Sequence, residues 1–165
     1  MNIVSVEQTG AELDSVRDLF LEYAASLSFN VCFGGFNQEL AALPGDYVPP
    51  RGCLLLAQKA DAVAGCVGVA RIDPDTCEMK RLYVRPLFRR AGLGRGLAAA
   101  AIARARALGY RRLCLETLPT MLEARSLYRS LGFTLCAPYY GAGCSGTECY
   151  ELRLTPAHYS NNLNF

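Results

Sequence analysis

The sequence predicts an α+β fold in which one mixed sheet carries helices, and three observations support this prediction. Residues 52–84 contain three β-rich runs separated by short turn signals, as in an antiparallel meander. Three other segments carry apolar residues at helical spacing. A further β-rich run follows the second of these helices, so the chain crosses over and returns parallel to an earlier strand. With 165 residues, 52% hydrophobic and 19% charged, we expect a single domain over residues 1–165.

The first half of the chain is expected to form a strand, two helices and the meander. Residues 2–7 alternate as a short strand. Residues 11–27 form an amphipathic helix, because apolar residues such as Leu13, Val16 and Phe20 recur at its spacing. An aromatic excursion over 28–51 encloses a short helix near 37–43. The meander strands are predicted at 52–59, 62–72 and 76–84.

The second half is expected to alternate helices with strands. A helix over 92–108 ends at Gly109, and a compact apolar strand follows at 112–117. Thr120 is the expected cap of a helix that runs to Leu131 and stops at Gly132. The last strands are predicted at 133–139 and 147–154, with a glycine-rich loop between them.

Composition excludes several kinds of site. His158 is the only histidine, and none of the eight cysteines forms a C-x-x-C pair, so we expect no metal site and reduced thiols. Cys144 and Cys149 are the two thiols for which reactivity stays open. No signal peptide and no stretch of 18 uncharged apolar residues is found, so we expect a cytoplasmic protein without a membrane partner.

The basic residues are concentrated between the predicted strand at 76–84 and the strand at 112–117. Lys80–Arg112 contains ten Lys/Arg and no acid, whereas residues 1–79 hold eleven acidic and four basic side chains. Within this stretch, Arg89–Gly96 places three glycines at the start of a helix. Unpaired helix amides, the helix dipole and several arginines together favour a bound pyrophosphate.

At this segment the sequence resembles the GNAT superfamily of acyl-CoA-dependent N-acyltransferases. The family motif Arg/Gln-x-x-Gly-x-Gly/Ala matches Arg89-x-x-Gly92-x-Gly94. Residues 78–86 resemble the family's fourth strand, and residues 124–133 resemble its fourth helix running into the sixth strand. The three motifs occur in the family's order, and the resemblance covers essentially the whole chain.

The resemblance implies a GNAT-type fold and a cofactor. The sheet would be mixed and mostly antiparallel, with six to seven strands, about four helices and a V-shaped splay between the fourth and fifth strands. Acetyl-CoA would insert its pantetheine arm into the splay and transfer its acetyl group to a primary amine of a small molecule or a peptide, by direct attack in a ternary complex. The implied cofactor-binding residues are Leu82, Tyr83, Val84, Arg89, Arg90, Ala91, Gly92, Leu93, Gly94 and Arg95.

Three residues are candidates for catalysis on the same resemblance. Glu78 and Glu116 occupy positions at which family members place a general base, and the sequence does not rank them. Tyr128 stands where many members carry a tyrosine that protonates the departing thiolate. Core packing is the alternative for Tyr128, since Leu127 and Leu131 share its apolar helix face. The asparagine that members often carry seven residues before this tyrosine is replaced by Met121.

Two other functions are kept as alternatives. A non-catalytic acyl-CoA sensor would bind the cofactor without turnover. A nucleic-acid module would use the basic 80–112 stretch, but this stretch has no aromatic residues interleaved with the basic ones on one strand face, and the remainder of the chain is acidic, which disfavours this function. A dinucleotide-binding fold is disfavoured because the third glycine of its motif falls on Leu97. Association into a homodimer is left open.

Overall fold

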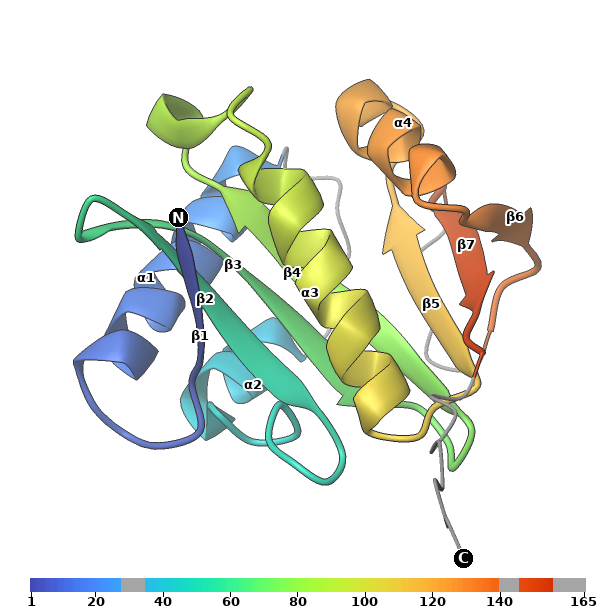
Figure 1. The fold of residues 1–165 in the computed structure, drawn as a ribbon, viewed down its shortest axis with the longest axis horizontal. Coiled ribbons are helices and arrows are strands. Elements are labelled where there is room, and N and C mark those ends of the chain that lie inside the picture. The colour runs from blue at the N-terminus through green and yellow to red at the C-terminus, as the bar shows by residue number, and fades with distance from the viewer. Residues whose placement is uncertain (28–34, 140–145, 156–165) are drawn as a thin grey trace, which may run out of the picture.

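The structure, a computed structural model, describes residues 1–27, 35–139 and 146–155 and consists of one sheet with helices on both faces (Figure 1). Phe29, Phe33, Cys32, Cys144 and His158 therefore lie outside the described residues. The helical elements are α1 (Ala11–Ser26), α2 (Phe36–Ala42), the 3-10 turn η1 (Pro86–Phe88), α3 (Leu93–Ala107) and α4 (Leu122–Ser130). The strands are β1 (Asn2–Ser5), β2 (Cys53–Lys59), β3 (Ala62–Arg71), β4 (Thr76–Val84), β5 (Arg112–Thr117), β6 (Thr134–Cys136) and β7 (Glu148–Arg153).

The strand order β1-β2-β3-β4-β5-β7-β6 confirms the predicted mixed sheet and gives it seven strands, within the expected six to seven. All neighbours are antiparallel except β4 and β5, which the α3 crossover makes parallel. The β4–β5 pairing covers only residues 76–78 and 112–114. Both strands continue beyond it without pairing to each other, and Figure 1 shows them diverging toward the ends of β4 and β5. This is the V-shaped splay that the family resemblance implied.

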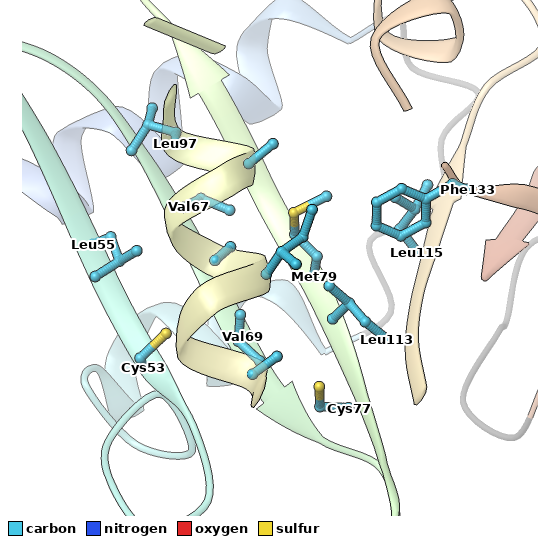
Figure 2. Close-up of a cluster of buried hydrophobic side chains, with 14 of the residues drawn as sticks. Cys53, Leu55, Val67, Val69, Cys77, Met79, Leu97, Leu113, Leu115 and Phe133 are labelled. Carbon is cyan, nitrogen blue, oxygen red and sulfur yellow. The ribbon is translucent and has the colours of Figure 1, made fainter. Parts of the chain in front are cut away.

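The α3 helix packs across β2, β3 and β4 because its small residues allow a close approach. Ala98, Ala101 and Ala105 are fully buried against the sheet. The sheet contributes side chains that alternate along its strands, and Figure 2 shows them beneath α3: Cys53, Leu55, Val67, Val69, Cys77 and Met79. Leu113, Leu115 and Phe133 extend the same core toward the second half of the sheet.

The opposite face of β1–β4 is covered by α1 and α2. Leu13, Val16, Leu19 and Phe20 of α1 have no exposed surface and meet Leu54 and Leu56 of β2. Burial of large side chains of this kind stabilises a fold by about 1.5–3 kcal/mol each relative to exposure. In Figure 1 neither α1 nor α2 extends beneath β5–β7, so the helices of the described residues leave this face open beside the splay.

Most predicted elements occur within two residues of their expected ends, and two features differ. The fourth helix begins after Met121, whose side chain cannot cap it, so Thr120 is not the N-cap. The last two strands are shorter than predicted, because β6 pairs with β7 only over Thr134–Cys136.

Candidate functional site

A β-bulge in β4 sets the orientation of the side chains that border the splay. Cys66 pairs with Tyr83, but Gly68 pairs with Lys80, so a single residue of β3 opposes both Arg81 and Leu82. Arg81 has a φ of +57°, in the left-handed region that side chains rarely adopt. Beyond a bulge of one residue every side chain changes face.

The bulge therefore directs two apolar side chains to the α3 face and Tyr83 to the α1 face. Leu82 and Val84 pack at the edge of the core beneath α3, whereas Tyr83 is buried against α1. A regular strand would have done the reverse.

Glu39 of α2 holds Arg81 in this conformation. The Arg81 guanidinium donates hydrogen bonds to both oxygens of the Glu39 carboxylate, at 3.2 and 2.6 Å, and lies 5.2 Å from the centre of the Phe36 ring. The Tyr47 hydroxyl donates to Glu39 as well. Burial alone would raise the pKa of Glu39, but the Arg81 hydrogen bonds and the nearby cations lower it. An ionised carboxylate thus links α2 to the bulge.

The start of α3 presents unpaired amides beside the splay. Gly92 caps the helix with a φ of +79° and no side-chain hydrogen bond, and the amide of Gly96 forms a bond to the Gly92 carbonyl at 3.0 Å. The N–H groups of the three residues between them lie in the first turn and have no partner within the helix. A Cβ atom added to Gly94 would lie 3.8 Å from Leu127 and 3.9 Å from Val84, so the position faces the gap between β4 and α4.

A cavity of about 660 Å³ occupies this gap. Its walls are the end of β4, the start of α3, the start of α4, and Tyr23, Ser26 and Leu27 at the end of α1 and directly after it. The cavity brings together nine of the ten predicted cofactor residues: Leu82, Tyr83, Val84, Arg89, Arg90, Gly92, Leu93, Gly94 and Arg95. Ala91 does not line it.

The arginines of the cavity are oriented by local bonds. Arg89 donates to the Val84 carbonyl at 2.9 Å and lies over the Tyr83 ring, and Arg95 donates to the Ser130 hydroxyl at 2.6 Å. Together with the α3 amides they make an anion site, and the end of β4 offers backbone groups that β5 does not pair. The residues present therefore fit a diphosphate attached to an extended, amide-bearing arm.

Glu78 and Glu116 lie on the sheet face opposite α3. Tyr139 donates a hydrogen bond to Glu78 at 2.8 Å, and Thr147 donates one to Glu116 at 3.1 Å. Burial raises the pKa of Glu78 and the negative charge of Glu116 adds to this, although Lys80 and the Tyr139 hydrogen bond act in the opposite direction. The two carboxylates are thus near enough to interact. The raised pKa of Glu78 is a property that suits a general base.

Tyr128 lies on the other side of the splay. It is 7% exposed and packs against Phe133 and Tyr150, with ring centroids 5.9 and 6.5 Å apart. Burial raises its pKa, and so does the charge of Tyr23, which stands on the opposite side of the sheet.

Tyr23 and Tyr139 were not singled out from the sequence. Tyr23 lines the cavity, and its ring centroid lies 6.0 Å from that of Tyr83. In the sequence, its position on the apolar face of the helix indicated only an ordinary core residue. Tyr139 follows β6, and only the folded chain brings it to Glu78.

The basic stretch does not form one positive surface. Arg81, Arg85 and Arg112 each pair with an acid from a distant element, namely Glu39, Glu22 and Glu151. The arginines that remain around the cavity are Arg89, Arg90 and Arg95. This arrangement fits a small anion better than a nucleic-acid backbone.

Within residues 1–27, 35–139 and 146–155, the structure shows no reactive thiol environment at Cys149, no metal-ligand cluster and no membrane-spanning helix. Cys149 is 5% exposed, and burial raises the pKa of its thiol, which opposes reactivity. No group of three metal-ligating side chains occurs in these ranges. None of their helices is both long and apolar enough to cross a bilayer.

Comparisons with known proteins agree with this geometry. A model of the acetyltransferase (GNAT) family matches residues 14–133. An uncharacterized N-acetyltransferase of Schizosaccharomyces pombe is 39% identical over 83% of this chain and 85% of its own. An acetyltransferase from Streptococcus agalactiae superposes with a TM-score of 0.78 at 21% identity, covering 93% of this chain and 98% of that one. A GNAT family acetyltransferase from Elizabethkingia anophelis, solved with acetyl-CoA bound, superposes at 0.68 with 20% identity over 93% and 97% of the two chains.

Proposed function

The chain belongs to the acetyltransferase (GNAT) family, and from this premise we propose that it transfers an acetyl group from acetyl-CoA to a primary amine in a ternary complex. One observation carries the proposal. A single cavity of about 660 Å³ joins the unpaired amides of α3, flanked by Arg90 and Arg95, to the unpaired end of β4. The first feature suits a diphosphate and the second suits a pantetheine arm.

Backbone and arginine groups would hold the cofactor in this proposal. The α3 amides and the side chains of Arg90 and Arg95 would bind the diphosphate. Leu82, Tyr83 and Val84 would pair with the pantetheine amides as a neighbouring strand does. Bound acetyl-CoA supplies a thioester whose acyl carbon is open to attack by a neutral amine. The N–H of Leu82 or Tyr83 would donate a hydrogen bond to the thioester carbonyl oxygen.

Proton transfer would use the groups on the two sides of the splay. Glu78 would accept the proton of the incoming amine, because its raised pKa brings it nearer to neutral pH than an exposed carboxylate. Glu116 is the neighbouring candidate, and its negative charge would help to keep the pKa of Glu78 raised. Tyr128 would donate its hydroxyl proton to the departing thiolate, and burial keeps that phenol protonated until it is needed.

Calorimetry and thiol release test the proposal together. We expect coenzyme A to bind the purified protein at micromolar to millimolar concentration, and we expect a panel of primary amines to release free thiol from acetyl-CoA. Absence of coenzyme A binding at millimolar concentration would contradict the assignment of the cavity. Binding without turnover of any amine would support the sensor alternative instead.

A further inference from the structure

A second cavity lies on the sheet face that carries Glu78. Its volume is about 480 Å³, and it is enclosed by α2, the turn after α2 and the adjoining parts of β3 and β4. Glu39, Tyr47, Ala70 and Lys80 are among its lining residues. Ala70 is the register partner of Glu78, so the cavity reaches the strand position beside that carboxylate.

Lys80 and Glu78 lie on the same face of β4. They are two residues apart in a strand whose intervening residue, Met79, is buried in the core on the α3 side. Two residues of a strand span about 6–7 Å. The lysine is also near enough to lower the pKa of Glu78. The two side chains therefore leave the same face of β4 from Cα atoms about 6–7 Å apart, with Lys80 in the wall of the cavity and Glu78 just beyond it.

The charge of Lys80 is only partly neutralised. Its ammonium lies 3.9 Å from Glu39 Oε2, which is too far for a hydrogen bond. Glu39 already accepts hydrogen bonds from Arg81 and Tyr47. The part of the chain that the structure describes offers the Lys80 ammonium no other carboxylate within 4 Å. Two cations thus meet a single carboxylate, and the lysine side chain is 31% exposed.

Asp46, the other acid of the cavity, does not change this balance. Its carboxylate lies 3.6 Å from the guanidinium of Arg51, and both side chains are well exposed. The positive charge on the β4 wall therefore remains available to an anion. A group that bound there would lie within one small molecule's length of Glu78.

We propose that the amine acceptor carries a carboxylate on the carbon next to its amino group, as an α-amino acid does, and that Lys80 binds this carboxylate while Glu78 faces the amine. The inference rests on the proposed function, since it names the acceptor class of the same enzyme. The arrangement suits this class because the Lys80 and Glu78 side chains leave one face of β4 from Cα atoms about 6–7 Å apart, so each can reach one group of an amine and a carboxylate carried on the same carbon. A charge-assisted hydrogen bond to Lys80 would select acids over neutral analogues.

Matched acceptors test the proposal. Initial rates of thiol release are measured for the common L-amino acids, for their carboxamides and for the amines left by decarboxylation. The three series share side chain and amine and differ at the carboxylate. We expect kcat/KM for the best amino acid to exceed that of its carboxamide by about 10- to 100-fold.

Variants assign the effect to the lysine. Lys80→Met is expected to raise the KM for the amino acid about 10- to 100-fold. Because the variant also removes a charge that lowers the pKa of Glu78, rates are compared above the acidic limb of each variant's pH profile, where kcat/KM for the carboxamide should fall much less than for the amino acid. Lys80→Arg retains the charge and should restore most of the preference. Lys59→Met is the control, because the chain's other lysine is exposed at the end of β2. The shift of Tm with coenzyme A should be the same in all three variants.

The outcomes separate the two ideas. Equal turnover of amino acids and carboxamides, or an unchanged KM in Lys80→Met, overturns the carboxylate site and leaves the acetyltransferase assignment standing. Failure of every amine in all series, by protein that binds coenzyme A, overturns the proposed function and the inference together.

Discussion

Replacing Gly94 by aspartate is expected to abolish coenzyme A binding without weakening the fold. The Cβ of residue 94 would lie 3.8 Å from Leu127 and 3.9 Å from Val84, which are ordinary contacts, so the side chain fits. Position 94 is also in the first turn of α3, where a carboxylate interacts favourably with the helix dipole by about 0.3–1 kcal/mol. The folded protein should therefore be as stable as the wild type.

The effect on binding is far larger because the carboxylate occupies the diphosphate site. Two like charges about 4 Å apart repel by about 4 kcal/mol at an effective dielectric constant of about 20. This corresponds to roughly a thousandfold loss of affinity. The new carboxylate can also accept hydrogen bonds from the α3 amide N–H groups that the diphosphate would use.

Calorimetry with coenzyme A and thermal unfolding without it measure the two effects separately. Gly94→Asn is the matched control, since it has the same shape without the charge and should retain much more affinity than Gly94→Asp. Gly94→Ala should gain about 0.5–1 kcal/mol in stability as a helical glycine replaced by alanine, and the family motif accepts alanine there. Unchanged affinity in Gly94→Asp would place the diphosphate elsewhere and refute the reasoning.

Three further predictions concern the splay and the bulge. Tyr139→Phe removes the hydrogen bond that lowers the pKa of Glu78, so the acidic limb of the kcat/KM profile should move to higher pH, and an unmoved limb would exclude Glu78 as the base. Tyr128→Phe should reduce kcat by about ten- to a thousandfold with coenzyme A affinity unchanged by calorimetry, whereas an unaltered rate would leave the tyrosine with packing alone. Glu39→Ala should lower the free energy of unfolding, measured in urea, by about 1–3 kcal/mol, because it removes the carboxylate that accepts two hydrogen bonds from the partly buried Arg81 guanidinium. An unchanged urea midpoint would show that other contacts hold the bulge.

Most of the fold was predictable because its signals are local. The helix over 92–108 and the strand over 112–117 follow from periodicity and from glycines at the helix ends, and the structure places both within one residue. Nine of the ten residues assigned to the cofactor line one cavity because they are nearly contiguous in sequence. Contiguous motifs keep their local geometry whatever the rest of the chain does.

The features that were missed depend on contacts between distant segments. Periodicity describes β4 as a regular strand, and nothing in its letters places Arg81 at a positive φ. That conformation needs the Glu39 carboxylate, which is 42 residues away in sequence. The Tyr139–Glu78 hydrogen bond spans 61 residues. Single-sequence patterns carry no information on such pairs, so the acceptor side of the site was less predictable than the cofactor side.

The short parallel ladder between β4 and β5 has a mechanical consequence. Only three residue pairs join the strands in the ladder, while beyond it the junction includes apolar packing of Leu82, Leu115 and Tyr128. Hydrogen-bonded ladders fix register, whereas apolar contacts have no preferred direction and tolerate small rotations. We therefore expect the ladder to act as a pivot about which the two parts of the sheet can change their separation without losing a backbone bond.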